Sequence, residues 1–282
     1  MMKHILITGA NSYIGDNVRD YLLREPEKYD VSVKDTINWK PTPSDFKDID
    51  VVFNVAGIAH IKETKQNRHL YYEINRDLVV EIAKTAKLAG VRHFIALSSM
   101  SVYGLLEGYI TKETPVNPKS AYGKSKAEAD EEIKKLEDDV FRFACLRPPM
   151  VYGKGCKGNY QKLRNFVLKS PVFPDYKNQR SMIYIGNLCE FVKEVIDEDK
   201  HGLFFPQNSE YVCTSEMAKL IAEVHGKKLL MTRVFNYFIA YMHIKIFKKV
   251  FGNLSYERAD LISRYNFVES LKYNNIKNNV LA

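Results

Sequence analysis

Lys3-His-Ile-Leu-Ile-Thr8 and the stretch that follows it, Gly9-Ala-Asn-Ser-Tyr-Ile-Gly15, decide the fold. The first is a short apolar run rich in β-branched residues, which is typical of a buried strand. Apolar residues then recur at helical spacing from 16 to 24. A strand, a glycine turn and a helix in this order predict a dinucleotide-binding unit. Gly9 permits a sharp turn, Gly15 permits close packing of helix on strand, and the free N–H groups at the helix start face a pyrophosphate.

The cofactor prediction depends on this turn and on the next strand, Tyr29–Asp35. Ser12 replaces the middle glycine of the usual fingerprint, and its small hydroxyl is compatible with a nearby phosphate or could donate to it. Asp35 lies about 20 residues beyond the turn, where a carboxylate binds the adenosine ribose and repels a 2′-phosphate. Asp35 could instead be only a turn residue, and Lys34 and Lys40 keep NADP open, so we predict NAD with NADP as the alternative. The turn residues predicted to bind the cofactor are Gly9, Asn11, Ser12, Tyr13, Ile14 and Gly15.

Strand and helix patterns alternate through the first two-thirds of the chain. We expect strands at 50–55, 93–97 and 141–146, and helices at 70–89 and from 122 to about 136. This alternation predicts an α/β fold with a parallel, doubly wound sheet, in which ligands bind at the carboxyl ends of the strands. We assign residues 1–150 to the dinucleotide-binding domain. Residues 151–282 form mostly a smaller substrate-binding lobe, with segments that return to the sheet.

Tyr122-Gly-Lys-Ser-Lys126 places a phenol and an ammonium one turn apart on the same helical face. A neighbouring cation favours the phenolate, so we expect the pKa of Tyr122 to lie below its usual value of about 10. Such a tyrosine can exchange a proton with a sugar hydroxyl when a hydride acceptor lies beside it. The spacing alone is weak, because tyrosine and lysine fall four apart in many helices. The glycine turn at the start of the chain gives it weight.

Composition excludes several classes of protein. The chain has 42 Lys+Arg and 34 Asp+Glu, a formal net charge of +8, but no basic run alternates with aromatic residues, so we predict no nucleic-acid partner. A mild positive charge also suits diphosphate ligands. The four cysteines are scattered without metal-ligand spacing, which predicts no metal site and a reducing compartment. We find neither a signal peptide nor a spanning segment and predict a cytoplasmic protein.

The chain resembles the extended short-chain dehydrogenase/reductases, in particular their NAD-dependent nucleotide-sugar epimerase/dehydratase group. The resemblance is carried, in order, by the motifs Thr8–Gly15, Asn54–Gly57, Leu97–Gly104, Tyr122–Lys126 and Arg147–Gly153. It implies that Ser99 bonds the substrate oxygen, that Tyr122 is the acid/base, and that Lys126 holds the nicotinamide ribose while lowering the pKa of Tyr122. It adds Val55, Ala56, Gly57 and Pro148 to the cofactor site, beside Tyr122 and Lys126 themselves.

The resemblance also implies substrate contacts and an assembly. Arg180, in the run Arg180–Leu188, resembles an arginine that grips the substrate diphosphate, and Asn159 lies where relatives contact the sugar or phosphate. The family usually forms homodimers through a four-helix bundle, here made by the helices expected at 70–89 and 120–136. The partner of the site is therefore expected to be a nucleotide-diphosphate sugar.

Three outcomes follow from the 4-keto sugar that this chemistry generates. Dehydratases of the family place Asp-Glu directly after the catalytic serine or threonine, whereas Met100 and Ser101 follow Ser99 here, so elimination is disfavoured. We predict 4-epimerisation of a UDP-hexose or UDP-N-acetylhexosamine in polysaccharide biosynthesis. Reduction of a supplied 4-keto nucleotide sugar with NAD(P)H is the alternative. A non-catalytic NAD(P) sensor is a second alternative, which the presence of both Tyr122 and Lys126 disfavours.

The segment 229–251 permits two interpretations. Phe235, Ile239, Met242 and Ile246 share one helical face, while Lys245, Lys248 and Lys249 cluster at its end. An interfacial helix on an anionic membrane surface has this pattern. So does an ordinary helix of the small lobe that covers the active site, and we prefer that interpretation.

Overall fold

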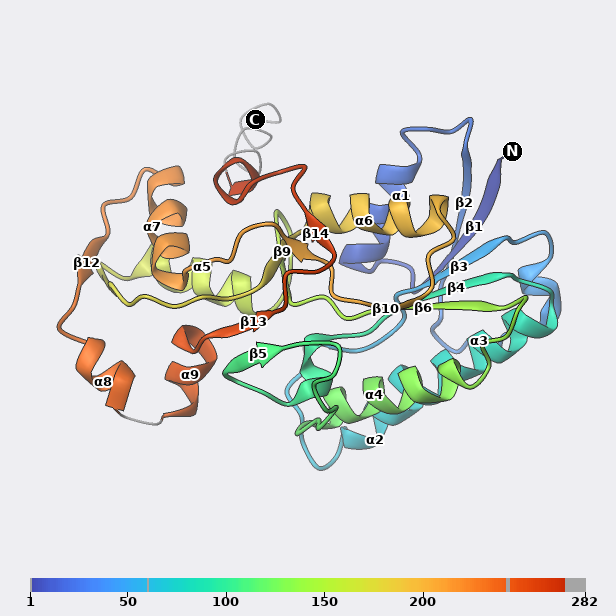
Figure 1. Ribbon diagram of the computed structural model, residues 1–282, viewed down its shortest axis with the longest axis horizontal. Coiled ribbons are helices and arrows are strands. Elements are labelled where there is room, and N and C mark those ends of the chain that lie inside the picture. The colour runs from blue at the N-terminus through green and yellow to red at the C-terminus, as the bar shows by residue number, and fades with distance from the viewer. Residues whose placement is uncertain (1, 60, 242–243, 272–282) are drawn as a thin grey trace. The chain divides into compact units, whose positions relative to one another are not determined.

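The computed structural model describes residues 2–59, 61–241 and 244–271, which divide into two units (Figure 1). The first unit contains Met1–Gly104, Pro115–Pro148 and Cys189–Phe205. The second contains Leu105–Thr114, Pro149–Leu188 and Pro206–Ala282. The chain therefore passes between the units several times.

A six-stranded parallel sheet forms the centre of the first unit, in the order β10-β6-β4-β3-β1-β2. The chain runs outward from β1 to β2 and then continues with β3 on the other side of β1, which makes a topological switch point between β1 and β3. This confirms the predicted doubly wound sheet. Ligands of such sheets bind at the switch point. The strands are β1 (Lys3–Thr8), β2 (Tyr29–Lys34), β3 (Val51–Asn54), β4 (His93–Leu97), β6 (Arg142–Leu146) and β10 (Gly202–Phe204).

Helices cover both faces of this sheet (Figure 1). On one face α3 and α4 pack side by side over a buried core that includes Val52, Ile82 and Phe94. On the other face lie α1 and α6. The helices are α1 (Tyr13–Leu22), α2 (Arg68–Tyr72), a π-helix (Glu73–Asp77), α3 (Leu78–Leu88), α4 (Ala121–Lys134) and α6 (Ile185–Asp197), with short 3₁₀ turns at Pro43–Phe46 and Met100–Tyr103.

The second unit is built from short strand pairs and helices. Its strand pairs are all parallel and join segments far apart in the sequence, as in β5 with β13. A buried tyrosine, Tyr152, links three of these segments, because its hydroxyl contacts Asn208 Nδ2 at 3.0 Å and Ser270 Oγ at 2.7 Å. The elements are β5 (Gly108–Ile110), β7 (Met150–Tyr152), α5 (Asn159–Lys169), β8 (Val172–Pro174), β9 (Met182–Tyr184), β11 (Gln207–Asn208), α7 (Thr214–Val224), β12 (Leu230–Thr232), α8 (Asn236–Tyr241), α9 (Lys245–Phe251), β13 (Leu254–Tyr256) and β14 (Leu261–Ile262).

The expectation of one amphipathic helix over 229–251 is wrong. The segment instead forms β12, which pairs with β8, and then the two short helices α8 and α9. Met242, one of the four apolar positions behind that expectation, lies outside the described residues. No helix in the described part of the chain is long and apolar enough to span a bilayer.

Candidate active site

At the switch point the turn Gly9–Gly15 packs closely against Val55 and Ala56, and we call this backbone surface the cradle. Gly9 has φ +106°, and a Cβ there would lie 2.8 Å from the Ala56 nitrogen. A Cβ on Gly15 would lie 2.9 Å from the Val55 Cγ2 atom. Ser12 caps α1, because its Oγ accepts the Gly15 N–H at 3.2 Å and keeps its own proton free to donate. This close approach of backbone at a helix N-terminus fits the pyrophosphate of a dinucleotide.

The other predicted turn residues continue this cradle. Asn11 is exposed and has φ +60°, a left-handed conformation that asparagine tolerates better than most residues. Tyr13 and Ile14 form the first turn of α1 and are half-buried. The next strands meet here too, since Thr8 Oγ1 donates to Asn54 Oδ1 at 2.8 Å across the switch point.

Asp35 follows β2 directly and is exposed. Its Oδ1 accepts the Ile37 N–H at 2.9 Å, so Asp35 has the turn role that the sequence offered as the alternative. That role leaves the second carboxylate oxygen for a ribose. Lys34 is held away, because its Nζ pairs with Asp45 at 2.8 Å and lies over the Trp39 ring.

The loop after β3 is fixed against α4 through a buried asparagine. Asn75, in the π-helix, accepts the Ile58 N–H at 2.7 Å and donates to the Ile58 carbonyl at 3.0 Å. Its Nδ2 also reaches Ser125 Oγ at 3.3 Å. A Cβ on Gly57 would lie 2.8 Å from Asn75 Oδ1 and 3.3 Å from Lys126 Nζ. The structure therefore brings the predicted cofactor segment Val55–Gly57 next to Lys126.

Ser99 is positioned by the turn that follows β4. Its Oγ accepts the Ser101 N–H at 3.1 Å and caps the 3₁₀ turn Met100–Tyr103. The Met100 N–H donates to the Pro148 carbonyl at 3.1 Å, which ties this turn to the end of β6. The Ser99 side chain also acts to lower the pKa of Tyr122, which means that it lies close to the phenol. Three predicted site residues, Ser99, Tyr122 and Pro148, are thus neighbours.

The predicted lowering of the Tyr122 pKa is wrong for the protein alone. Protein atoms crowd the phenol, including the ring of Tyr71 at 6.4 Å between centroids, and this desolvation raises the pKa of Tyr122, while the nearby Ser99 hydroxyl opposes the rise. Lys126 Nζ donates instead to the Leu97 carbonyl at 2.9 Å. Burial lowers the pKa of Lys126 to about 8. The two side chains share a helical face, but burial rather than their mutual charge dominates both groups.

A buried ion pair below these residues was not predicted. Asp130 Oδ2 accepts from Ser98 Oγ at 2.7 Å and from Arg147 Nε at 3.1 Å, and Arg147 NH1 donates to the Tyr103 hydroxyl at 2.9 Å. Burial raises the pKa of Asp130, whereas the Arg147 charge lowers it. The signal was present in the sequence, because Asp130 continues the four-residue spacing of Tyr122 and Lys126. The pair joins α4 to the ends of β4 and β6.

The two predicted substrate residues belong to the second unit. Asn159 is exposed and is the first residue of α5. The Arg180 backbone exchanges hydrogen bonds with Val212 at 2.9 and 3.0 Å, and its NH1 donates to the Gly252 carbonyl at 2.7 Å. Burial lowers the pKa of Arg180. The guanidinium is therefore anchored by one nitrogen.

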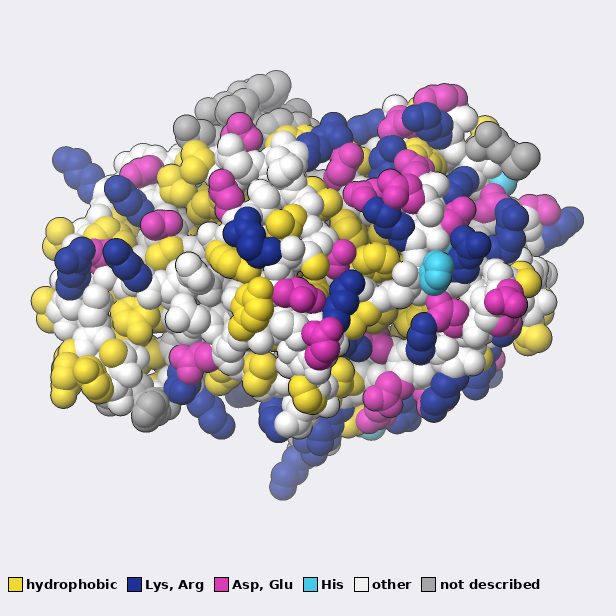
Figure 2. Space-filling model, in the orientation of Figure 1, with side chains coloured by type: hydrophobic (Ala, Val, Ile, Leu, Met, Phe, Trp, Pro, Cys, Tyr) yellow, Lys and Arg dark blue, Asp and Glu magenta, His cyan; other side chains and the backbone are white. Residues whose placement is uncertain are grey.

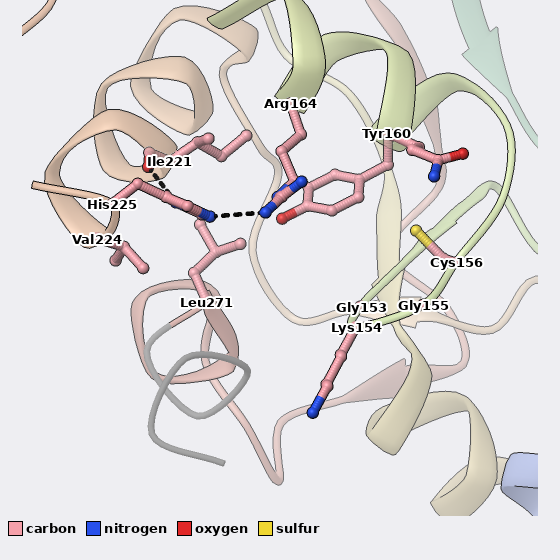
Figure 3. Close-up of a pocket in the computed structure, with 11 residues that line it drawn as sticks. Gly153, Lys154, Gly155, Cys156, Tyr160, Arg164, Ile221, Val224, His225 and Leu271 are labelled. Atoms are coloured by element: carbon pink, nitrogen blue, oxygen red, sulfur yellow. Dashed lines mark hydrogen bonds between the residues drawn. The ribbon is translucent and has the colours of Figure 1, made fainter. Parts of the chain in front are cut away.

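A pocket of about 260 Å³ lies in the second unit between the loop after β7, α5 and the end of α7. In Figure 3 Arg164 and His225 meet across it, and Lys154 points away from them. Arg164 NH2 is 2.9 Å from His225 Nε2, and His225 Nδ1 is 2.8 Å from the Ile221 carbonyl. The sequence pattern did not single out these residues, because they come together only through the packing of α5 on α7.

The fold and this switch-point site define a Rossmann-type dinucleotide-binding protein. Residues 5–205 match the model of the NAD dependent epimerase/dehydratase family. The chain belongs to this family. The predicted class, an NAD(P)-dependent enzyme of the epimerase/dehydratase group, is thereby confirmed.

Known relatives are similar over most of the chain. A UDP-glucose 4-epimerase of Vibrio cholerae is 29% identical over 294 residues, covering 94% of this chain and 85% of that protein. An N-acetyl-α-D-glucosaminyl-diphospho-ditrans,octacis-undecaprenol 4-epimerase of Escherichia coli O157:H7 is 24% identical over 210 residues, covering 68% of this chain and 63% of that protein.

Solved structures share the fold. A UDP-glucuronic acid 4-epimerase of Bacillus cereus in complex with NAD has a TM-score of 0.77 at 18% identity, covering 98% of this chain and 99% of its own. A dTDP-4-dehydrorhamnose reductase of Clostridium acetobutylicum has a TM-score of 0.77 at 22% identity, with the same coverage.

Proposed function

We propose that the protein is an NAD-dependent nucleotide-sugar 4-epimerase that acts through a transient 4-keto sugar. The observation that carries this proposal is the meeting of Ser99, Tyr122 and Lys126 beside Gly57, next to the switch-point cradle. Such a trio can hold a sugar hydroxyl and move its proton where a dinucleotide binds. Similarity to two 4-epimerases supports the choice of reaction.

Each residue of the trio has a distinct proposed role. The Ser99 hydroxyl orients the substrate oxygen, and Tyr122 removes and returns the proton of the sugar hydroxyl. Lys126 holds the ribose next to the nicotinamide. When bound in its oxidised form, NAD supplies a hydride acceptor and a positive charge, and a positive charge near a phenol lowers the phenol pKa. This charge offsets the burial that keeps Tyr122 protonated in the protein alone.

The proposed substrate is a UDP-hexose or UDP-N-acetylhexosamine used in polysaccharide biosynthesis. Arg180 suits the diphosphate, because a guanidinium binds phosphate oxygens through several N–H groups. Asn159 suits the sugar or a phosphate, since its exposed amide both donates and accepts. The names of the two 4-epimerases place UDP-sugars first in the panel to be tested and a sugar on a polyprenyl diphosphate second.

Incubation with a panel of UDP- and GDP-hexoses, and with a polyprenyl-diphosphate N-acetylglucosamine, tests the proposal. We expect a C4 epimer without net change of NAD(P)H absorbance. Stoichiometric consumption of NAD(P)H on a 4-keto nucleotide sugar would assign the reductase alternative instead. Cofactor binding without any product in the whole panel would favour the sensor alternative.

Cofactor binding can be tested separately with two glycines of equal φ. Gly9 and Gly202 both have φ +106°, but a Cβ on Gly202 meets nothing within 4 Å. Gly202→Ala therefore adds only backbone strain, about 1 kcal/mol. Gly9→Ala adds a clash with the Ala56 backbone at the cradle, and we expect its NAD affinity to fall about ten-fold or more. Equal NAD affinity in the two variants, measured by calorimetry, would contradict the cradle.

We also propose a homodimer in which each chain supplies two helices of a four-helix bundle: the continuous run of α2, the π-helix and α3, and the helix α4. Within the first unit Leu70, Ile74 and Leu78 recur at four-residue spacing and stay half-buried, which leaves apolar surface for a partner. Ile74→Glu should convert a dimer into a monomer in light scattering. A wild-type monomer would contradict the proposal.

A further inference from the structure

α8 exposes an aromatic surface that the fold does not use. Figure 2 shows hydrophobic side chains gathered at this end of the second unit. No residue of α8 is buried, and the rings of Tyr237 and Tyr241 pack on each other at 4.7 Å between centroids. We define the α8–α9 surface by its exposed apolar members, with their exposed fractions: Val234 74%, Phe235 42%, Tyr237 68%, Phe238 49%, Tyr241 69%, Ile244 38% and Ile246 64%.

The surface is firmly attached although its rings are exposed. β12 pairs with β8 immediately before it. Arg233 Nε then pairs with Asp175 Oδ2 at 2.9 Å, and Asn236 Nδ2 donates to the Asp175 carbonyl at 2.8 Å. These contacts fix the base of α8. The aromatic rings are therefore not needed to hold α8 in place.

The segment that carries these rings has charged side chains of one sign, although Arg233 and Lys248 pair with Asp175 and Glu107 from other segments. Residues 227–251 contain six Lys or Arg and no Asp or Glu. Lys228, Lys245 and Lys249 are exposed and make no ion pair within the described residues. Aromatic rings bordered by unpaired lysines are typical of a protein surface that lies in the interface of an anionic bilayer.

We propose that the α8–α9 surface docks the protein on an anionic lipid bilayer, with the rings in the headgroup region and the lysines against lipid phosphates. A second copy of the chain fits this surface poorly. A symmetric contact would bring two copies of this positively charged segment together, with no carboxylate of the segment to neutralise the unpaired lysines. A bilayer that carries negative charge is complementary to both features.

Vesicle flotation with the full chain tests the docking. We compare vesicles of pure phosphatidylcholine with vesicles containing one-third phosphatidylglycerol, and expect about ten-fold stronger binding to the anionic vesicles, weakened by salt. Tyr237→Ser combined with Tyr241→Ser should reduce binding about ten-fold. Ile37→Ser combined with Val140→Ser is the matched control, because these first-unit side chains are 78% and 65% exposed, and it should bind like wild type.

A second pair of variants separates the local lysines from net charge. Lys245→Glu with Lys249→Glu, and Lys47→Glu with Lys169→Glu, change the net charge equally, and all four lysines are exposed. Only the first pair should lose binding, by about ten-fold. Equal loss in both pairs, or no binding of wild type to anionic vesicles, overturns the proposal. A dimer that dissociates on the two tyrosine replacements, while vesicle binding persists, assigns the surface to a second copy and also overturns it.

A spectroscopic reporter covers the case in which a serine variant fails to fold. Trp39 is the only tryptophan of the chain, so Trp39→Phe combined with Tyr237→Trp gives a single probe on the α8–α9 surface. Its emission should shift to shorter wavelength on addition of anionic vesicles and stay unchanged with neutral ones. An unchanged spectrum with both kinds of vesicle contradicts docking.

Discussion

Tyrosine and lysine occur four residues apart in both units, with opposite surroundings. In the first unit Lys126 is 7% exposed and Tyr122 is half-buried, with the Ser99 side chain close to its phenol. In the second unit Tyr241 is 69% exposed and Lys245 is exposed as well. The spacing is the same, but only the first pair lies at the carboxyl edge of a parallel sheet. Surroundings rather than spacing therefore decide which pair can do acid–base chemistry and which is suited to a surface contact.

The architecture of each unit explains this difference. Parallel strands in the first unit end together, so the Leu97 carbonyl and the turns after β3 and β4 converge on α4. Among its described residues the second unit has only two-stranded pairs, and α8 follows one of them with no buried residue. A long sheet can enclose polar groups and satisfy them. Short strand pairs leave more side chains at the surface.

The largest expected effect comes from removing the tyrosine hydroxyl of the Tyr122–Lys126 pair, with the same change in the Tyr241–Lys245 pair as its control. Tyr122→Phe should lower kcat about 10³- to 10⁴-fold, roughly 4 to 5.5 kcal/mol, because no other group in the trio can take the substrate proton. Tyr241→Phe should leave kcat unchanged. Epimerase assays of both variants under saturating substrate check this. Similar kcat values for the two variants would contradict the conclusion that only the first pair does acid–base chemistry.

The two units also differ in the burial of an ion pair, and the next largest expected effect is on stability. Asp130→Asn leaves Arg147 buried without a countercharge, and we expect a loss of about 3 to 5 kcal/mol in the free energy of unfolding. Asp175→Asn removes the partner of Arg233 at an exposed pair in the second unit and should cost below about 1 kcal/mol. Urea unfolding measures both. If Asp175→Asn lost more stability than Asp130→Asn, the conclusion that the strongly stabilising polar contacts are the buried ones of the first unit would be contradicted.

The sequence predicted the first unit far better than the second. β1 and β4 have the predicted bounds, and the glycine turn lies at the predicted switch point, because periodic apolar runs and turn residues are local signals. The π-helix that places Asn75 and the Asp130–Arg147 pair were missed. Both depend on contacts between segments distant in the sequence. The direction of the Tyr122 pKa shift was wrong for the same reason, since spacing carries no information on burial.

The second unit was predicted only as a looser lobe. Its strand pairs join segments that are not adjacent in the sequence, more than a hundred residues apart for β5 and β13, and their register has no local signature. The same holds for the pocket formed by Arg164 and His225. The segment 229–251 carried an amphipathic pattern, but pairing of β12 with β8 outweighed helix formation at its start.

Acid stability gives a smaller effect, specific to the first unit. Burial lowers the pKa of His93 to about 4 from 6.5. The unfolded chain therefore binds a proton that the folded chain does not between these values, and stability is lost as the pH falls from 6.5 to 4. We expect a loss of roughly 3 kcal/mol from this group. His93→Gln should flatten that part of the pH profile in urea titrations; an unchanged slope would contradict neutral burial of His93.

The smallest expected effect is on the free energy of unfolding when Lys126 or Lys245 is replaced. Burial lowers the pKa of Lys126 from 10.5, its value in the unfolded chain, to about 8 in the folded protein, because the charged form is disfavoured there. Stability should rise with pH from 8 to 10.5, because the unfolded chain binds more protons there. Lys126→Met should thus stabilise the protein at pH 7 by about 1 kcal/mol while abolishing activity. Lys245→Met should change stability by less than about 0.5 kcal/mol. Thermal unfolding compares them.

The most direct test of the central claim, that Tyr122 moves the proton of a sugar hydroxyl beside bound NAD, uses a UDP-hexose deuterated at C4. The wild-type protein should return the C4 epimer with deuterium retained and no net NADH, and Tyr122→Phe should return unchanged substrate. An epimer that has gained solvent hydrogen at C4, or equal turnover by Tyr122→Phe, would contradict it.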